Sequence, residues 1–530
     1  MIRILLTLLL CSQFSLCFAA EKRAPNIVII YTDDQGFGDV SSMNADAKFD
    51  TPNLDRLARE GISFTNAHSS DSVCTPSRYG LLTGRYAWRT KLKKGVMVAE
   101  GKCLIDDQTL TLPAMLKDNG YATAMVGKWH LGMTFNGRRG QRDWSLPVTD
   151  MPLDKGFDYF FGIPASLNYG ILAWFEGRHA KVPPTLFTAK KRNKRHVDYR
   201  IKPPYQASAA ETKQVLKKAG FEVAADFIDN QCLTRFTDQA LTWMGQHLES
   251  GAKDSSAVKP FFLYLPFTSP HYPVCPLPEF HGKGDCGGYG EFMIETDYRV
   301  GQILDFLDQK GIADNTLVIL TSDNGPETSW KKRIDDFGHH SNGNYRGGKR
   351  DIYEGGHRVP FLVRWPQGIS DPGRTTDRLT GQTDVFATIA QMLKVRLSED
   401  AAVDSCSFAS VLQNSTDDSQ RLALVNHGVK GRFAVTQGAW KLVIPYQKLN
   451  AELYNLETDP SEKTNLFDQR PKVVKELTSQ ITKIVSRGRT TDGDVQANDT
   501  GYWADLAWLT RKEYEAAIQV QTQVDQKRNP

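Results

Sequence analysis

Two pairs of hard oxygen donors stand far apart in the chain, Asp33-Asp34 and Asp323-Asn324. Adjacent carboxylates repel each other, so both ionise readily only when a cation lies near them. Carboxylate and amide oxygens are ligands for Ca²⁺ or Mg²⁺, whereas Zn²⁺ favours nitrogen and sulfur. Either pair alone is explained as well by turn and cap residues, because Asp and Asn are common there. Together the two pairs predict one site for a hard divalent cation.

Cationic and imidazole side chains form a second group. Lys128 and His130 follow a glycine, and strand alternation places them on one side of the chain. Lys349 ends the glycine-rich segment 345–349, and glycines let a backbone approach a ligand closely. His271 lies between two prolines, and an imidazole is well suited to give a proton to a leaving group near neutral pH. Each of these residues alone also fits a surface or structural role, but the set predicts anion binding with proton transfer.

The stretch Cys74-Thr75-Pro76-Ser77-Arg78 precedes a helical pattern. Pro76 suits the first turn of a helix, where its missing N–H group is no loss. Cys74 then lies at or just before the helix N-terminus, where free N–H groups and the helix dipole favour an anion. Arg78 lies one turn further on, close enough to share that anion. A lone cysteine is more often a small buried residue or half of a disulfide, so the prediction of a reactive site depends on the whole stretch.

The elements that would position these residues can be read from short apolar runs. We expect strands at Asn26–Tyr31, Ala122–Val126, Phe261–Phe267 and Thr316–Leu320, and helices at Leu54–Glu60, Leu112–Asp118, Phe227–Leu248 and Tyr298–Lys310. Strands that alternate with helices predict a doubly wound α/β sheet. Each of the four runs is followed closely by polar or ionisable residues, and ligands of such sheets bind beyond the carboxyl ends of the strands. We therefore expect the candidate residues to meet at one edge of the sheet.

The motif at Cys74 and the polar groups that follow the strands together resemble the type I, formylglycine-dependent sulfatases of the alkaline phosphatase superfamily. The resemblance runs from Asn26 to about Asn465 and includes Leu453-Tyr454-Asn455-Leu456. It implies an α/β fold with a large mixed, mostly parallel sheet sandwiched by helices, and a smaller α+β C-terminal domain. It also implies one Ca²⁺ per chain and conversion of Cys74 to 3-oxoalanine (formylglycine). The metal ligands implied are Asp33, Asp34, Cys74, Asp323 and Asn324.

The resemblance also implies a role for each catalytic candidate. Hydrated formylglycine at Cys74 is the nucleophile, Arg78 steadies the hydrate and His130 assists it. Lys128 and Lys349 bind sulfate oxygens, and His271 protonates the leaving alcohol. One hydroxyl of the hydrate attacks sulfur, and loss of a proton from the second hydroxyl then expels sulfate and restores the aldehyde. An unmodified thiol lacks that second hydroxyl, which gives a physical reason for the modification.

The predicted function is hydrolysis of sulfate esters with release of inorganic sulfate from a sulfated carbohydrate. Glycosaminoglycan and algal polysaccharide are both candidate substrates, and a galactose or N-acetylgalactosamine 6-sulfate is our specific expectation. Two other readings are a phosphatase or phosphodiesterase of the same superfamily and a non-catalytic protein that binds sulfated glycans. The hard-oxygen donors and Cys74 argue against the first, and the intact set of site residues argues against the second. Loops around the pocket set specificity, with candidates Asn168-Tyr169, Trp174, His179, His339-His340 and Arg358.

Length and composition bound the remaining expectations. The 530 residues give room for two domains, and we expect a signal peptide at 1–20, a catalytic domain at 24–394 and an α+β subdomain at 395–530. The net charge of +4 is too small to indicate nucleic-acid binding, and no apolar run predicts a membrane anchor. We therefore expect a secreted or periplasmic protein, lysosomal or extracellular in a eukaryote, that meets a formylglycine-generating enzyme during maturation.

The sequence alone does not decide how the cysteines are paired. Two of the eight lie within residues 1–20, and setting Cys74 aside leaves an odd number, so at least one should be unpaired within the chain. Cys275 and Cys286 are the nearest pair, and we expect either a disulfide between them or two thiols.

Overall fold

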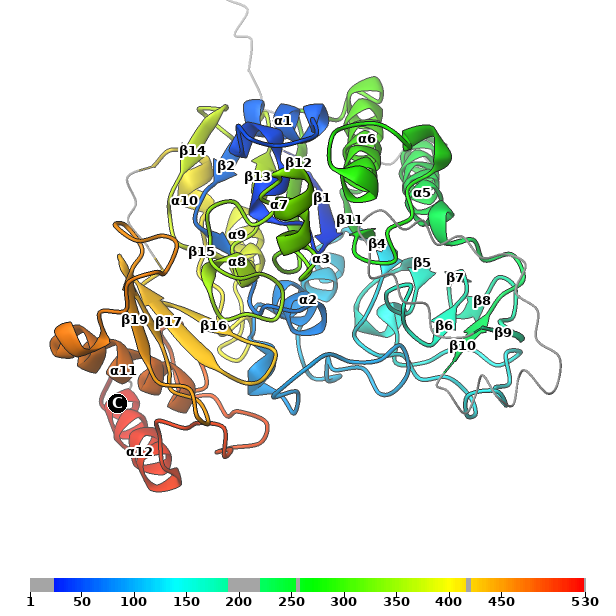
Figure 1. Cartoon of the computed structure of the whole chain (residues 1–530). Helices are drawn as coiled ribbons and strands as arrows, with labels where there is room; N and C mark the ends of the chain where they lie inside the picture. Colours follow the sequence, from blue (N-terminus) through cyan, green and yellow to red (C-terminus); the bar gives the residue numbers. More distant parts are fainter. Residues whose placement is uncertain (1–22, 189–219, 254–257, 416–420, 529–530) are drawn as a thin grey trace, which may run out of the picture.

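The structure is a computed structural model that describes residues 23–188, 220–253, 258–415 and 421–528. The expected signal peptide at 1–20 lies outside the described residues. A ten-stranded sheet forms the centre of the larger part of the molecule (Figure 1). Its strands, in spatial order, are β14 (Arg374–Thr376), β2 (Ile62–Phe64), β13 (Phe361–Arg364), β12 (Thr316–Ser322), β1 (Asn26–Asp33), β11 (Phe261–Pro270), β4 (Ala122–Lys128), β5 (Tyr159–Ile163), β7 (Phe175–Glu176) and β8 (His179–Ala180).

The middle of this sheet is parallel. β1 pairs in parallel with both β11 and β12, β11 pairs with β4, and β4 pairs with β5. Antiparallel pairs appear toward the edges, between β12 and β13, β13 and β2, β5 and β7, and β7 and β8. The central strands are buried along almost their whole length because they carry continuous apolar runs, as expected for parallel strands covered on both faces. The predicted mixed, mostly parallel sheet is confirmed.

Helices cover both faces of the sheet (Figure 1). α1 (Pro52–Arg59), α5 (Cys232–Lys253) and α6 (Gly287–Gln309) gather on one side, and α2 (Cys74–Thr83) and α3 (Leu112–Asp118) lie on the other. The remaining helices of this part are α7 (Trp330–Phe337), α8 (Glu354–His357), α9 (Asp384–Met392) and α10 (Ala409–Leu412). The predicted helix at Tyr298–Lys310 is only the second half of α6, because Gly287, Gly288 and Gly290 at its start are poor helix formers in isolation.

Within the described ranges, three smaller sheets accompany the large one. One joins β6 (Ile171–Leu172), β10 (Phe221–Val223) and β9 (Leu186–Thr188), and another joins β15 (Thr380–Gly381) with β3 (Ala67–His68). The C-terminal part holds an antiparallel sheet of β16 (Leu424–His427), β17 (Phe433–Gln437), β18 (Trp440–Val443) and β19 (Glu452–Asn455), with α11 (Pro471–Ser486) and α12 (Arg511–Arg528) beside it. This sheet has its own hydrophobic cluster, which agrees with the predicted α+β C-terminal domain. The domain boundary between residues 394 and 395 stays a prediction.

Of the two alternatives left open for Cys275 and Cys286, the structure does not form the disulfide. Cys286 is fully buried at the start of α6 and carries a free thiol. Burial raises the pKa of this thiol to about 12, so it remains protonated and packs as a small apolar side chain.

Candidate active site

The four strands predicted to deliver polar residues are neighbours in the sheet, in the order β12, β1, β11, β4, and all run in the same direction. Their carboxyl ends therefore meet at one edge. Asp33 and Lys128 are the last residues of β1 and β4, while His271 and Asp323 directly follow β11 and β12. Asp34 and His130 follow with φ angles of 68° and 61°, a left-handed backbone that is uncommon for residues other than glycine.

Oxygen atoms at this edge form a pocket for a cation. One carboxylate oxygen from each of Asp33, Asp34 and Asp323 lies within 4.8 Å of the others. Asp33 Oδ1, Asp34 Oδ2 and Asn324 Oδ1 are buried without any hydrogen-bond partner. Burying such oxygens unpaired is costly, so this donor set fits a hard divalent cation. Burial and the Asp33 carboxylate raise the pKa of Asp323 to about 6, which reflects the crowding of negative charge that a cation would relieve.

The buried cationic side chains of Lys128, Arg78 and Lys349 surround the carboxylates, and Lys349 Nζ lies 2.6 Å from Asp34 Oδ1. Lys128 Nζ lies 2.6 Å from Asp33 Oδ2, and Arg78 Nη2 lies 2.8 Å from Asp323 Oδ2. Arg78 also donates from Nη1 to the carbonyl of Lys128 at 3.0 Å, which ties α2 to the end of β4. A divalent cation added to these charges would leave the site positive, as the binding of a sulfate ester requires.

The loop that carries Lys349 reaches the site through close backbone contacts. Gly325 donates its N–H to the carbonyl of Gly356 at 2.9 Å, and a Cβ at Gly325 would lie only 1.9 Å from the carbonyl oxygen of Gly355. Any larger residue at position 325 would push the Asp323 loop away from the Lys349 loop. The glycine that follows Asp323-Asn324 is thus explained by this close approach.

Cys74 is the first residue of α2 and is 2% exposed. Its sulfur, an oxygen of Asp33 and a nitrogen of His271 lie within 4.8 Å of one another. The N-terminus of α2 therefore lies beside the cation pocket, and Gly84 ends the helix in a left-handed conformation with φ 62°. Burial raises the pKa of the Cys74 thiol even though Lys128 and Lys349 oppose that effect. The encoded thiol is therefore not an activated thiolate.

The two histidines are held as neutral imidazoles. Burial, and then Lys128 and Arg78, lower the pKa of His130 well below its usual value, and its ring packs 4.7 Å from that of Tyr169. Burial, and then Lys349 and Lys128, lower the pKa of His271. His271 Nδ1 lies 2.5 Å from the carbonyl of Tyr272, so Nδ1 carries the hydrogen. Nε2 of His271 then faces the site, 3.7 Å from Asp34 Oδ2.

Three of the seven suggested specificity residues have other contacts in the fold. Trp174 is buried in an aromatic cluster with Phe161 and Phe227. His339 is buried and bonds to Asp39 at 2.8 Å. Arg358, which directly follows the short helix α8, is paired with Glu354 at the start of that helix. His179 and His340 are exposed. Among these candidates only Asn168-Tyr169 lies beside the site, through the contact of Tyr169 with His130.

Three polar side chains near the site escaped the sequence analysis. Glu327 lies four residues after Asp323, and its Oε2 is 4.0 Å from Lys349 Nζ. Arg350 follows Lys349 directly, so adjacency to a predicted site residue was an available signal. His427 belongs to the C-terminal sheet, and its Nδ1 lies 2.7 Å from Oδ2 of Asp71, a residue three positions before Cys74. No local sequence pattern points to His427.

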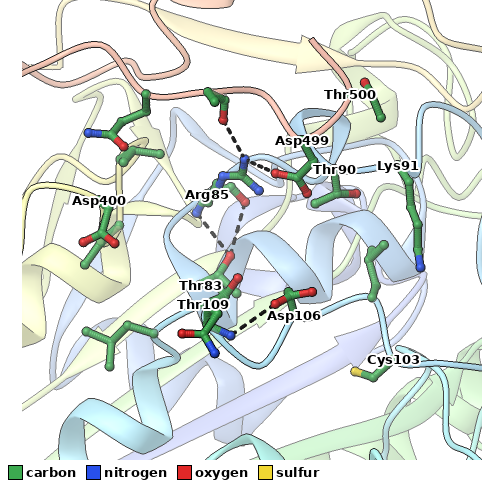
Figure 2. Close-up of a pocket in the computed structure, with 18 of the residues that line it drawn as sticks. Thr83, Arg85, Thr90, Lys91, Cys103, Asp106, Thr109, Asp400, Asp499 and Thr500 are labelled. Carbon is green, nitrogen blue, oxygen red and sulfur yellow. Dashed lines mark hydrogen bonds and ion pairs between the residues drawn. The ribbon is translucent and has the colours of Figure 1, made fainter.

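A separate hollow of about 540 Å³ lies around the C-terminal end of α2 (Figure 2). Thr83, Arg85 and Asp499 are among the residues that line it, and Arg85 pairs with Asp499 at 2.7 Å. None of the predicted site residues lines this hollow.

A search of the helices in the described ranges finds none with the length and apolar character that a membrane span requires.

Comparison with known proteins places these features in a family. The family described as Sulfatase matches residues 25–395, and the family described as N-sulphoglucosamine sulphohydrolase, C-terminal, matches residues 343–487. The chain is 34% identical to an N-acetylgalactosamine-6-O-sulfatase of Bacteroides thetaiotaomicron over 88% of this chain and 94% of that protein. It is 30% identical to human steryl-sulfatase over 77% of this chain and 73% of that protein.

A solved structure agrees with the sequence comparison. It comes from work on the metabolism of multiple glycosaminoglycans by Bacteroides thetaiotaomicron and superposes with a TM-score of 0.74 and 33% identity, covering 88% of this chain and 100% of that chain. The chain therefore belongs to the sulfatase family and is a sulfuric ester hydrolase.

Proposed function

We propose that this sulfatase releases inorganic sulfate from a sulfated carbohydrate, specifically a 6-sulfated galactose or N-acetylgalactosamine unit. The activity toward this sugar is supported by the relative named N-acetylgalactosamine-6-O-sulfatase, which matches 88% of this chain. The observation that carries the chemistry is the cluster of unpartnered buried oxygens on Asp33, Asp34 and Asn324 beside Cys74. These oxygens could bind a cation next to position 74, which is the nucleophile position at the N-terminus of α2.

Asp33, Asp34, Asp323 and Asn324 are the proposed ligands of one Ca²⁺, with the residue at position 74 completing the set. Bound there, Ca²⁺ supplies Lewis-acid stabilisation of negative charge on the sulfuryl oxygens. Lys128 and Lys349 each contact one aspartate and extend toward the same region, so they are placed to bind the remaining sulfate oxygens.

Burial raises the pKa of the Cys74 thiol, and a thiol also lacks the second hydroxyl whose deprotonation would expel sulfate, so we propose a hydroxyl nucleophile at position 74. Formylglycine, made from Cys74 by a formylglycine-generating enzyme, supplies that hydroxyl as its hydrate. Arg78 is fully buried, is held by Asp323 and reaches the end of β4, so it fixes the geometry around position 74. His130 is neutral, and its unpartnered Nδ1 is available to hold a proton of the hydrate.

His271 is the proposed general acid. The carbonyl of Tyr272 fixes its ring through Nδ1, which leaves Nε2 directed to the site. An anionic sulfate ester next to this imidazole favours its protonated form, and the proton then passes from Nε2 to the leaving alcohol oxygen. Because the ligands, the maturation and the substrate all fit an exported enzyme, we also propose a secreted or periplasmic location.

Mass spectrometry of the peptide that carries Cys74, together with sulfate release, tests this proposal. Protein co-expressed with a formylglycine-generating enzyme should contain an aldehyde at position 74 and release sulfate from N-acetylgalactosamine 6-sulfate. Cys74→Ala should fold with the same circular dichroism and release none. An intact thiol in fully active protein would contradict the nucleophile, and binding of the sugar sulfate without its hydrolysis by modified protein would favour a glycan-binding role.

A further inference from the structure

A carboxylate lies at the edge of the candidate site although sulfate binding does not call for one. Glu327 Oε2 is 4.0 Å from Nζ of Lys349, and the Glu327 side chain is 13% exposed. A negative charge so close to a sulfate-binding lysine weakens the attraction for an anionic ester. The cost to sulfate binding indicates that Glu327 has a separate task.

Arg350 fixes this carboxylate in place. The two side chains form a bidentate pair, with Nη1 2.5 Å from Oε1 and Nη2 2.8 Å from Oε2. The backbone of Arg350 has φ 82°, and its N–H donates to the carbonyl of Ser72 at 2.9 Å, which ties it to the loop before Cys74. A left-handed arginine is uncommon and is maintained here by contacts on both sides.

Glu327 remains charged in this environment. Burial opposes its ionisation, but hydrogen bonds from Arg350 and the charge of Lys349 outweigh burial and hold the pKa of Glu327 far below its ordinary value. Oε1 also accepts from the N–H and hydroxyl of Thr328 at 2.8 and 2.9 Å. Oε2 has only the Arg350 bond, so it retains capacity to accept another hydrogen.

The carboxylate lies on the leaving-group side of the site. Lys349 Nζ, which is 4.0 Å from Glu327 Oε2, contacts Asp34 Oδ1 at 2.6 Å. Nε2 of His271, the proposed general acid, lies 3.7 Å from Oδ2 of the same Asp34 carboxylate. The ring of Tyr272 stacks on that of His271 at 4.6 Å. A sugar held there for attack on its sulfate brings ring hydroxyls toward this side. A hydroxyl both donates and accepts, and the pair offers a carboxylate acceptor next to guanidinium donors.

We propose that Glu327, positioned by Arg350, determines specificity by accepting a hydrogen bond from a ring hydroxyl close to the sulfated carbon of the sugar. This inference rests on the proposed carbohydrate function. In a 6-sulfated hexopyranose, the hydroxyl nearest the sulfate is the one on C4, so that group is the expected partner. A sulfate ester without such a hydroxyl gains nothing from Glu327.

The test compares kcat/KM of wild-type enzyme and Glu327→Ala on three substrates. These are N-acetylgalactosamine 6-sulfate, its 4-deoxy analogue and 4-nitrophenyl sulfate. Loss of a hydrogen bond to a charged group should lower kcat/KM of the variant for the sugar by about 10- to 100-fold. The kcat/KM of the wild-type enzyme should be lower by about the same factor on the 4-deoxy analogue than on N-acetylgalactosamine 6-sulfate. The kcat/KM of the variant should differ little between these two sugars. Both enzymes should hydrolyse 4-nitrophenyl sulfate within about threefold of each other.

Two further variants keep the test decisive. In Glu327→Ala, the charge of Arg350 loses its partner, and this alone could disturb the fold. Glu327→Ala/Arg350→Ala removes both charges and so avoids that effect. The double variant should show the same pattern of kcat/KM on the three substrates as Glu327→Ala. Glu457→Ala removes an exposed carboxylate and should match wild type on all substrates.

Three outcomes would overturn the inference. An equal loss on all three substrates would show that Glu327 acts only by holding Lys349. An unchanged kcat/KM of Glu327→Ala on a sugar that the wild type hydrolyses would overturn this inference alone. Wild-type turnover of 4-nitrophenyl sulfate without turnover of any 6-sulfated sugar would overturn the proposed substrate, and this inference with it.

Discussion

The Nζ of Lys349 lies 2.6 Å from Oδ1 of Asp34, although the two residues are 315 positions apart in the chain. The other oxygen of the same carboxylate, Oδ2, is buried without a hydrogen-bond partner. Asp34 thus links the predicted cation to a predicted sulfate-binding lysine. Burial alone would lower the pKa of Lys349, but Asp34 and the neighbouring acidic groups raise it well above its usual value, so the ammonium is permanently charged.

Lys349→Ala should therefore reduce kcat/KM by about 10- to 100-fold, the usual effect of losing one hydrogen bond to a charged group. Sulfate release from N-acetylgalactosamine 6-sulfate measures this effect. Lys332→Ala is the matched control, because Lys332 forms only an exposed pair with Asp336 on α7. Wild-type kinetics in Lys349→Ala would contradict a role in sulfate binding.

Removal of the metal should reduce stability as well as activity. Without a cation, Asp33 Oδ1, Asp34 Oδ2 and Asn324 Oδ1 stay buried and unpaired. Treatment with a chelator should lower the melting temperature, and Ca²⁺ at about 100 times its dissociation constant should restore about 2.7 kcal/mol. In Asn324→Ala, Ca²⁺ should produce a smaller shift. If the melting temperature changes neither with the chelator nor with added Ca²⁺, a structural metal at this site is excluded.

The fold and most of the site follow from local sequence. Strands such as Asn26–Asp33 are continuous apolar runs, and their ends carry the polar groups, so parallel pairing alone brings Asp33, Lys128, His271 and Asp323 together. What local patterns do not contain is which distant side chain completes an ion pair. Nothing in the local sequence around Glu327 or Arg350 indicates the ion pair that they form in the folded protein.

The same limit explains why the sequence left several residues with two alternative roles. Trp174 and His339 are residue types that often bind sugars, but tertiary packing encloses the first among Phe161 and Phe227 and the second against Asp39. Sequence spacing also made Cys275 and Cys286 a plausible pair, whereas the fold uses Cys286 as a buried apolar residue. Residue type alone does not separate a packing role from a recognition role.

His271→Ala should affect substrates according to their leaving groups. A general acid contributes about 10²- to 10⁴-fold, and a sugar alcohol needs its proton far more than a nitrophenolate does. We expect kcat for the 6-sulfated sugar to decrease by a factor within this range, and kcat for 4-nitrophenyl sulfate to decrease much less. A series of aryl sulfates should show a steeper dependence on leaving-group pKa in the variant. His340→Ala, which changes an exposed histidine, is the control, and equal losses on all leaving groups would exclude proton donation by His271.

A buried pair of histidines should make the protein sensitive to acid. His68 Nε2 lies 2.8 Å from Asn66 Oδ1, and His68 Nδ1 lies 2.9 Å from His357 Nδ1. His357 Nε2 lies 3.1 Å from both Lys441 Nζ and the carbonyl oxygen of Ile352, and a second proton on His68 would add a buried positive charge near the Lys441 ammonium. Burial lowers the pKa of His68 to about 3.

The unfolded chain therefore takes up a proton at His68 below its ordinary pKa of about 6.5, while the folded protein does not until about pH 3. Stability from this group is complete above about pH 6.5 and falls by about 1.4 kcal/mol per pH unit as the pH drops through that window. Urea unfolding at pH 7, 6 and 5 measures the slope. His68→Gln should show a shallower slope, and an unchanged slope would assign the acid sensitivity to other groups.

The C-terminal sheet should support catalysis through His427. Its Nδ1 lies 2.7 Å from Asp71 Oδ2, and its carbonyl accepts the N–H of Ser72 at 3.2 Å. The carbonyl of Ser72 in turn accepts the N–H of Arg350. His427 thus holds the loop before Cys74 and, through it, the loop of Lys349, and a shift of about 1 Å in such a group can cost about 10²-fold in rate.

His427→Ala should lower kcat by at least about tenfold at a temperature where the variant is fully folded, with a loss of about 1–3 kcal/mol in urea unfolding from the unpaired Asp71 carboxylate. Asp71→Ala/His427→Ala should recover much of the stability, because no buried group is left unpaired, but not the rate, because the loop is still released. His247→Ala changes a histidine of α5 outside the site and should leave kcat unchanged. Recovery of the rate together with the stability would show that His427 acts only by stabilising the fold, and full activity of His427→Ala would exclude both roles.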